Sequence, residues 1–271
     1  MSFNMKIVHF NSGLGNQIFQ LMLCRYFAEK GFSVYGYYNK KWLQQHNGLE
    51  VDRVLDGDIP PSSLISNVVA LFCRLVHRFD KKGRFFVSDE ICNLGGVYFS
   101  GYWQDKKIYK SLKKPVFRNF CLSENNKKIV KMMDGCNSVS VHIRRGDYLS
   151  PEIIARMGNI CTLDYYQKAI QLVKTKISQP NFFVFSDDIE WARENFKEDY
   201  IHFIDWNKGK DSFFDMYLMA QCKAHIIANS SFSYWGAYLS EENLLTIYPS
   251  RWYNDRTSPD IFLDSWLPVE V

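Results

Sequence analysis

Short apolar runs alternate with amphipathic stretches through the second half of this 271-residue chain. Four apolar runs bounded by turn residues predict strands, at 139–143, 182–185, 201–204 and 225–228. Helical spacing of apolar residues predicts helices around them, at 129–133, 164–176, 189–196, 212–222 and 232–239. Because strands that alternate with helices form a parallel sheet covered on both faces, the second half is predicted to be an α/β domain.

The first half begins with the same alternation. The pattern predicts a strand at 6–10, a tight loop at 11–15, a helix at 17–30 and a strand at 32–38. Such a β-α-β unit implies a parallel pair of strands and is similar to half of a Rossmann-type layer.

The region that follows is less regular, with a predicted helix at 64–76 and a predicted aromatic strand at 97–103. A new series of strands begins after Gly135. We therefore predict an N-terminal domain at 1–135 and a C-terminal domain at 136–271.

Composition and charge narrow the class of protein. With 46% hydrophobic and 16% aromatic residues, the chain can fill one large core or two smaller ones. Its 33 basic and 29 acidic residues are too balanced for a nucleic-acid backbone to be the main partner. Residues 1–10 do not resemble a signal peptide, and the seven cysteines form no Cys-x-x-Cys pair. We therefore expect a cytoplasmic protein with reduced thiols.

The most apolar stretch, at 64–76, is interrupted by polar residues and is shorter than the roughly 20 residues that span a bilayer. A basic cluster lies beside it and would suit anionic lipid head groups: Arg74, His77, Arg78, Lys81, Lys82 and Arg84. Peripheral contact with the inner face of a membrane is therefore one interpretation. A buried helix followed by a solvated loop is the interpretation we favour.

The strand at 139–143 runs directly into Arg144, Arg145, Gly146 and Asp147. A guanidinium presents a planar fork of donors that matches phosphate oxygens, so this pair of arginines would suit a pyrophosphate. Two alternatives are a surface arginine pair that bridges to acidic neighbours and an Arg-Gly-Asp adhesion signal. Three residues carry little information, so we give the adhesion signal less weight.

A second candidate loop follows the first strand. Its glycines, which include Gly15, allow a close backbone approach at a helix N-terminus, and Asn16 with Gln17 adds two polar side chains. The loop lacks the third glycine of the dinucleotide fingerprint, and bulky Ile18 lies where close packing favours a small residue. This pattern argues against a nicotinamide enzyme. A simple tight turn would need the glycines but not the two amides.

Two further strand ends carry polar side chains. Ser186, Asp187 and Asp188 follow one strand, where the carboxylates would accept from a guanine or, for Asp188, cap the next helix. A second set, Asn229, Ser230 and Ser231, follows another strand and opens a helix with hydroxyls and free amides. A plain N-cap serine is the alternative there.

The Asp56-Gly57-Asp58 triplet matches the Asp-x-Asp metal motif of many sugar-nucleotide enzymes. Its neighbours are typical of a loop, and the arginine pair offers another means of neutralising a diphosphate. We interpret the triplet as a turn and predict no metal site.

Five segments, in this order, resemble the alpha-1,2-fucosyltransferases of glycosyltransferase family 11, so that the resemblance covers nearly the whole chain. They are 13–17 (GLGNQ), 101–104 (GYWQ), 142–148 (HIRRGDY), 185–188 (FSDD) and 227–237 (IANSSFSYWGA). The chain departs from the family pattern at four positions, which puts the choice of acceptor in doubt more than the reaction: Ser12, Leu21, Tyr234 and Tyr238.

The resemblance implies a GT-B-like architecture of two Rossmann-type domains facing each other across a cleft. It implies GDP-fucose as the donor substrate, a terminal β-galactoside as the acceptor, inversion at the fucose anomeric carbon, and neither a metal nor another cofactor. The domain at 1–135 would then lie on the acceptor side, and 136–271 would bind the GDP-sugar. The chain looks like the bacterial members, which build fucosylated surface polysaccharide or lipopolysaccharide side chains from the cytoplasmic side.

On this hypothesis Arg144 and Arg145, with groups near Ser230 and Ser231, hold the diphosphate as charge grows on the departing oxygen. His142 would orient the phosphate or the fucose.

The other roles follow the same hypothesis. Asp187 and Asp188 would read guanine, while Asn16 and Gln17 would face the fucose and the acceptor. Asp147 is either the general base or a salt-bridge partner that locks Arg144 in place. A non-catalytic GDP-sugar-binding protein is the alternative function.

Overall fold

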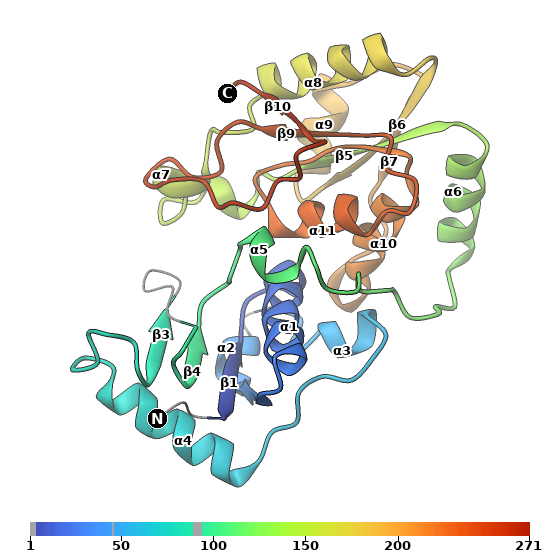
Figure 1. The fold of residues 1–271 in the computed structure, drawn as a ribbon. Coiled ribbons are helices and arrows are strands. Elements are labelled where there is room, and N and C mark those ends of the chain that lie inside the picture. The colour runs from blue at the N-terminus through green and yellow to red at the C-terminus, as the bar shows by residue number, and fades with distance from the viewer. Residues whose placement is uncertain (1–3, 45, 89–93) are drawn as a thin grey trace. The chain divides into compact units, whose positions relative to one another are not determined.

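The computed structural model describes residues 4–44, 46–88 and 94–271, and the chain divides into two compact units, Met1–Arg118 and Asn119–Val271 (Figure 1). Each unit contains a sheet whose strand pairs are all parallel. The prediction of an α/β fold with parallel sheets is confirmed.

The boundary near Gly135 was predicted wrongly. Helix α6 (Glu124–Asp134) precedes that glycine, which is only its C-cap, yet the helix packs on the second unit. The buried Asn126 side chain accepts a hydrogen bond from Trp206 at 2.7 Å, and Met133 lies in a core cluster with Phe183. Helix α6 therefore belongs to the unit that starts at Asn119, because its apolar face is buried there.

The first unit contains the predicted β-α-β start, formed by β1 (Met5–Phe10), α1 (Leu14–Glu29) and β2 (Ser33–Tyr38). Its sheet has the strand order β2-β1-β4-β3. The remaining elements are α2 (Lys40–Leu43), α3 (Val51–Val54), α4 (Leu64–Val76), β3 (Phe86–Ser88), β4 (Tyr98–Ser100) and α5 (Lys106–Tyr109). Strand β4 is shorter than predicted: it ends at Ser100, and Trp103, the last residue of the predicted range, has a left-handed φ of 58°.

Helix α4 has the predicted bounds but not the favoured environment. Its outward side chains are exposed, including Leu64 at 81% and Leu75 at 68%. The expectation of a buried helix is therefore wrong, because only Ser66, Ala70 and Cys73 of the helix are buried.

The second unit has a sheet of six parallel strands in the order β10-β9-β8-β5-β6-β7. Its strands are β5 (Asn137–Ile143), β6 (Pro180–Ser186), β7 (Ile201–Ile204), β8 (Ala224–Ile226), β9 (Leu245–Pro249) and β10 (Leu267–Val269). Its other helices are η1 (Asp147–Leu149), α7 (Ile154–Met157), α8 (Leu163–Lys176), α9 (Ile189–Asn195), η2 (Gly209–Asp211), α10 (Phe213–Gln221) and α11 (Ser231–Leu239). The four strands predicted in this half are all present.

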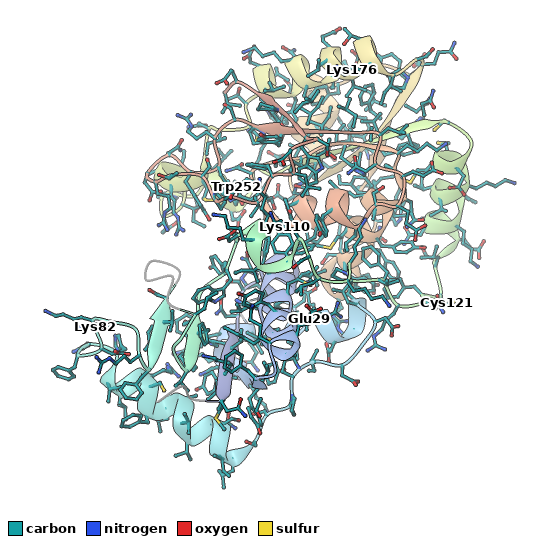
Figure 2. All side chains as sticks on the ribbon, in the orientation of Figure 1. Glu29, Lys82, Lys110, Cys121, Lys176 and Trp252 are labelled. Atoms are coloured by element: carbon teal, nitrogen blue, oxygen red, sulfur yellow. The ribbon has the colours of Figure 1, made fainter. Side chains whose placement is uncertain are left out.

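Both faces of this sheet are packed by core clusters. Figure 2 draws the described side chains on the ribbon. Along β6, Phe182 and Val184 join a core cluster with residues of α8 and α9. The alternate residues Phe183 and Phe185 join a second cluster with residues of α6 and α10. A strand buried on both faces reads as a continuous apolar run, which explains why β6 was visible in the sequence.

Candidate functional site

Three neighbouring parallel strands of the second unit place their following loops at one edge of the sheet. Strand β5 pairs with β6 on one side and with β8 on the other. In the β5–β6 register Ile143 lies opposite Ser186, so Arg144 and Asp187 leave the sheet at the same level. The carboxyl edge of a parallel sheet is where ligands bind in such folds.

Arg144 is held by two carboxylates. Its Nη2 lies 2.9 Å from Asp147 Oδ2, and its Nη1 lies 3.2 Å from Asp187 Oδ2. Burial alone would lower the pKa of Arg144, but Asp187 and Asp147 raise it above its usual value. Two roles were predicted for Asp147, and the structure shows one of them, the salt bridge to Arg144. A general base remains unassigned.

Arg145 is anchored differently. Its Nε lies 3.1 Å from Asp188 Oδ2, its guanidinium stacks 4.1 Å over the ring of Trp191, and its backbone N–H donates to Asp187 at 2.9 Å. The terminal nitrogens Nη1 and Nη2 make no hydrogen bond to the described residues. Arg145 therefore presents donors for a ligand, while the guanidinium of Arg144 is engaged at both ends.

Gly146 is required by this network. A Cβ built on it would lie 2.9 Å from Asp187 Oδ2, the same oxygen that pairs with Arg144. A larger residue would push that carboxylate away from the arginine. The Arg145-Gly146-Asp147 triplet is thus built into a charge network rather than displayed as an adhesion hairpin.

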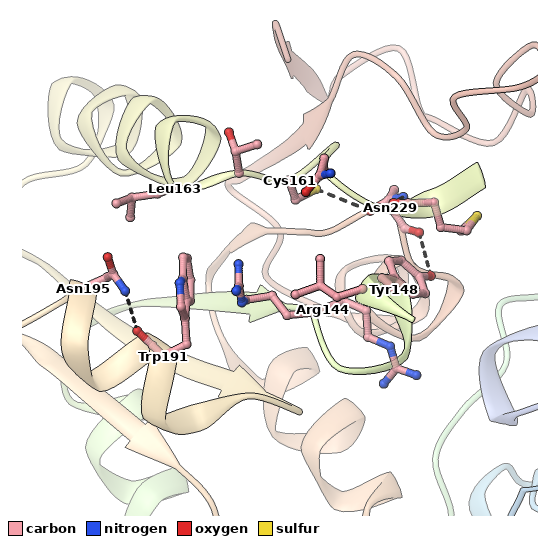
Figure 3. A pocket seen from close by; sticks show the side chains of 13 residues that line it. Arg144, Tyr148, Cys161, Leu163, Trp191, Asn195 and Asn229 are labelled. Carbon is pink, nitrogen blue, oxygen red and sulfur yellow. Dashed lines mark hydrogen bonds between the residues drawn. The ribbon is translucent and has the colours of Figure 1, made fainter. Parts of the chain in front are cut away.

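A cavity of about 210 Å³ lies beside the arginine pair (Figure 3). Of the predicted site residues, Arg144, Arg145 and Asn229 line it. The other lining residues are Tyr148, Leu149, Met157, Gly158, Asn159, Cys161, Thr162, Leu163, Trp191 and Asn195. Figure 3 shows Trp191 and Asn195, both on α9, with a hydrogen bond of 2.8 Å from the Asn195 side chain to the Trp191 carbonyl.

Sequence reasoning missed the aromatic wall of this cavity. Trp191 lies three residues after Asp188, which caps α9 by accepting from the Trp191 N–H at 3.4 Å. An aromatic residue in the first turn after a capping aspartate at a strand end was the available signal. Residues 157–163 of the wall come from a connection between helices, and no motif identified them.

Asp188 performs the capping role that was one of its two predicted roles. The Asp187 carboxylate bonds to Arg144 and to the Arg145 backbone, and the Ser186 hydroxyl accepts from the Asp188 N–H at 2.9 Å. A guanine that donates to Asp187 or Asp188 would have to bind a carboxylate that already accepts hydrogen bonds within the protein. Guanine recognition by this pair stays a prediction.

The loop after β8 is fixed mainly by Asn229. This side chain is buried and donates to the carbonyls of Met157 and Trp252, both at 3.1 Å. The Ser230 hydroxyl accepts from the Phe232 N–H at 3.3 Å, so the plain N-cap alternative is present. Ser231 begins α11 and is partly exposed.

His142 lies on β5 just before the arginine pair and is 6% exposed. Burial, and then the charge of Arg144, lower its pKa to about 3, so the ring is neutral at ordinary pH. Its Nδ1 is buried without a hydrogen-bond partner among the described residues. Its predicted part in orienting the phosphate or fucose remains a prediction.

The loop after β1 in the first unit corrects the role predicted for Gln17. This side chain is fully buried. Its Nε2 donates to the carbonyls of Ser12 and Gly48 at 2.8 and 2.9 Å, and its Oε1 accepts from the N–H groups of Glu50 and Val51. Because both donors and both acceptor positions are used within the protein, Gln17 fastens this segment, and its amide has no group left for the fucose.

The role predicted for Asn16, which is to face the fucose and the acceptor, stays a prediction. Asn16 is partly exposed, and its Oδ1 accepts from the Gln104 side chain at 3.2 Å, which joins two of the segments behind the resemblance. Gly15 is a buried residue of the first turn of α1. Ser12 has a φ of 63°, in the left-handed region that favours glycine.

Metal-ligand side chains do not gather in the described part of the chain: no group of three or more His, Cys, Asp or Glu occurs there. In the Asp56-Gly57-Asp58 triplet, Gly57 has a φ of 98°, which fits the predicted turn. The site's cationic groups are the arginines at the end of β5.

Comparisons with known proteins give the family. The family model described as glycosyl transferase family 11 matches residues 78–270. An alpha-1,2-colitosyltransferase of Escherichia coli is 32% identical over 95% of this chain and 96% of its own length.

Two further relatives match over shorter stretches. An O-antigen biosynthesis glycosyltransferase of E. coli, WbnK, is 31% identical over 64% of this chain and 60% of its own. A gorilla galactoside alpha-(1,2)-fucosyltransferase 2 is 28% identical over 65% and 53%. A match over most of the chain to one family, and to a relative over nearly its full length, makes this protein a member of glycosyl transferase family 11.

Proposed function

We propose that this glycosyltransferase moves L-fucose from GDP-fucose to the 2-hydroxyl of a terminal β-galactoside in a surface glycan precursor, with inversion and without a metal. Family membership and the alpha-1,2-fucosyltransferase relative support the reaction class. The O-antigen relative supports a role in surface glycan synthesis.

In the proposed reaction the acceptor 2-hydroxyl attacks the anomeric carbon of fucose from the face opposite the phosphate. A new C–O bond forms, the bond to the β-phosphate oxygen breaks with its electron pair, and the hydroxyl proton leaves to a base or to water. The products are the fucosylated galactoside, GDP and a proton. Negative charge therefore grows on the diphosphate, which is where fixed cationic donors lower the barrier.

Arg145 is the residue on which this proposal depends most. Its Nη1 and Nη2 make no hydrogen bond to the described residues, while Asp188 pairs with its Nε and the guanidinium stacks on Trp191. Such a held fork can bind two phosphate oxygens without losing much side-chain entropy. We assign Arg144 the supporting role, since Asp147 and Asp187 fix it next to Arg145.

The cavity bears on the donor's nucleoside. At about 210 Å³ it is smaller than the roughly 300–1,000 Å³ of pockets that enclose a whole ligand. We therefore propose that it takes the nucleoside, with the Trp191 side chain as its aromatic wall, and that the diphosphate lies at the arginines. The acceptor would be bound by the first unit, as in the GT-B-like arrangement that the resemblance implies.

Incubation with GDP-fucose and a β-galactoside, with and without chelator, tests the proposal. We expect GDP release together with a fucosylated product, at a rate that the chelator does not change. GDP-fucose binding without product would favour the non-catalytic alternative. Activity that chelator abolishes and a divalent cation restores would contradict metal independence.

One observation favours a second donor. The relative that matches nearly the whole chain is named for colitose, a sugar that is fucose without its 3-hydroxyl. A comparison of kcat/KM for GDP-fucose and GDP-colitose decides between them. A higher value for GDP-colitose would replace fucose in the proposal and leave the role of the arginines unchanged.

A further inference from the structure

Helix α4 is attached to its unit by a narrow face. Ser66, Ala70 and Cys73 are its buried residues, and Ala70 and Cys73 pack in a core cluster with Ile7 and Tyr98. Ser63 and Ser66 form a capping box that fixes the start of the helix, and Arg74 donates to the Tyr37 hydroxyl at 2.9 Å. These contacts fix the rotation of the helix about its own axis.

This rotation turns the large apolar side chains outward. Seven of the thirteen exposed large hydrophobic residues that the structure describes lie in this helix and the turn after it: Leu64, Ile65, Val68, Leu71, Phe72, Leu75 and Phe79. At about 100° per residue, the six on the helix occupy an arc of roughly 120°. Soluble helices normally bury such a stripe, so its exposure marks an interaction surface.

Positive charge adjoins the stripe. From Leu64 to Phe86 the chain has five Lys or Arg residues and one acidic residue, an excess of four that equals the excess of the entire chain. The acidic residue, Asp80, is occupied: its carboxylate accepts from the backbone N–H groups of Arg84, Phe85 and Phe86. Arg78, Lys81 and Lys82 are exposed in the turn that Asp80 fixes, and Figure 2 labels Lys82 there.

We propose that helix α4 and the following turn, 64–84, bind the surface of an anionic lipid bilayer. The apolar stripe would enter the acyl boundary, and the cations would contact the head groups. A 13-residue helix is about 20 Å long, too short to cross the roughly 30 Å hydrocarbon core, so it lies in the plane of the interface. Among the described residues, no helix has the length and apolar content to cross a membrane.

Charge complementarity selects the bilayer over a second copy of the chain. Two copies joined through this surface would bring together two segments that each carry four excess positive charges. Like charges at an interface oppose association, whereas an anionic bilayer offers both an apolar interior and opposite charge.

Flotation of the full chain with vesicles tests this inference, and no turnover is measured, so the result does not depend on the proposed function. We expect binding to equimolar phosphatidylcholine and phosphatidylglycerol, and little binding to phosphatidylcholine alone. Arg78→Gln with Lys81→Gln should weaken binding by about fivefold for each charge removed. Leu71→Gln with Leu75→Gln should weaken it by about tenfold or more.

Matched controls separate this surface from general charge and apolarity. Lys128→Gln with Lys131→Gln removes two exposed charges from α6, and Leu244→Gln removes another exposed leucine; both should bind as the unaltered chain does. All these positions are exposed, so thermal unfolding should be unchanged. Equal binding to neutral vesicles, equal loss in the controls, or a dimer that Leu71→Gln with Leu75→Gln dissociates would overturn the proposal.

Discussion

The segments that follow β1 and β5, each after an interior strand of a parallel sheet, carry polar side chains that behave differently. After β1, Gln17 is fully buried and its amide is used up by four backbone groups. After β5, Arg145 keeps two nitrogens without a partner among the described residues. Position in the fold therefore does not tell which polar side chains are satisfied within the protein and which keep donors for a ligand; the hydrogen-bond partners of each side chain do.

The two segments also differ in what holds them. Backbone groups hold the first, and a network of two arginines and three aspartates holds the second. In the second segment the aspartates hold the arginines, and the terminal nitrogens of Arg145 are left for a ligand. Substitutions in the first segment should therefore change stability, and those in the second should change catalysis.

The largest effect is expected for Arg145→Lys, which replaces the planar fork with a single ammonium. Transfer activity should fall about a hundredfold or more, equivalent to about 3 kcal/mol of lost transition-state stabilisation. Steady-state kinetics with the donor varied measures this. Arg193→Lys is the matched control, because Arg193 pairs with an aspartate on the surface of the same unit. Near-normal turnover by Arg145→Lys would remove the central role of this residue.

Gln17→Ala should have the opposite profile. It leaves the buried N–H groups of Glu50 and Val51 without their acceptor, so the free energy of unfolding should fall by about 2 to 3 kcal/mol. Denaturant unfolding measures the change, with the exposed Gln44→Ala as control. A stable variant that has lost donor binding would restore Gln17 to the ligand site.

Two buried histidines, His9 on β1 and His142 on β5, should make the stability of the protein depend on pH. Burial is the main cause that lowers the pKa of His142 to about 3 and that of His9 to about 4, from 6.5. Above pH 6.5 both histidines are neutral in the folded and the unfolded state. Below pH 6.5 the unfolded chain binds more protons than the folded one, so the free energy of unfolding decreases as the pH is lowered. We expect a loss of about 1 to 2 kcal/mol for each histidine between pH 6.5 and about pH 5.

Denaturant midpoints measured against pH test this expectation. His142→Gln and His9→Gln should each flatten the dependence, whereas His77→Gln, at an exposed position, should leave it unchanged. If neither buried variant alters the slope, other groups control the acid response.

The smallest effect is expected for Asp147→Asn. If Asp147 only positions Arg144, the amide keeps part of the contact and activity should fall by a few-fold, equivalent to about 1 kcal/mol. Single-turnover rates measure the change, with Asp164→Asn as the control because its carboxylate forms a surface ion pair with Lys168. A loss of about a thousandfold would instead identify Asp147 as the general base.

The sequence by itself predicted several secondary-structure elements correctly. Periodicity alone predicted the strands from β5 to β8 and the bounds of α4, because a strand buried on both faces and an amphipathic helix leave distinct patterns. The Arg144-Arg145 pair was singled out because two adjacent guanidinium groups at a strand end suit an anion. In the structure both arginines bridge to aspartates, the alternative considered for them, and their binding of a diphosphate stays a prediction.

Tertiary structure decided the rest. The domain boundary depended on where α6 packs, the role of Gln17 on which backbone groups reach it, and the wall at Trp191 on two strands meeting side by side. It also decided that the apolar face of α4 points outward, since periodicity shows that a face exists but not what covers it. Local pattern determines elements, whereas contacts between residues far apart in the chain determine which polar groups are satisfied and which surfaces remain open.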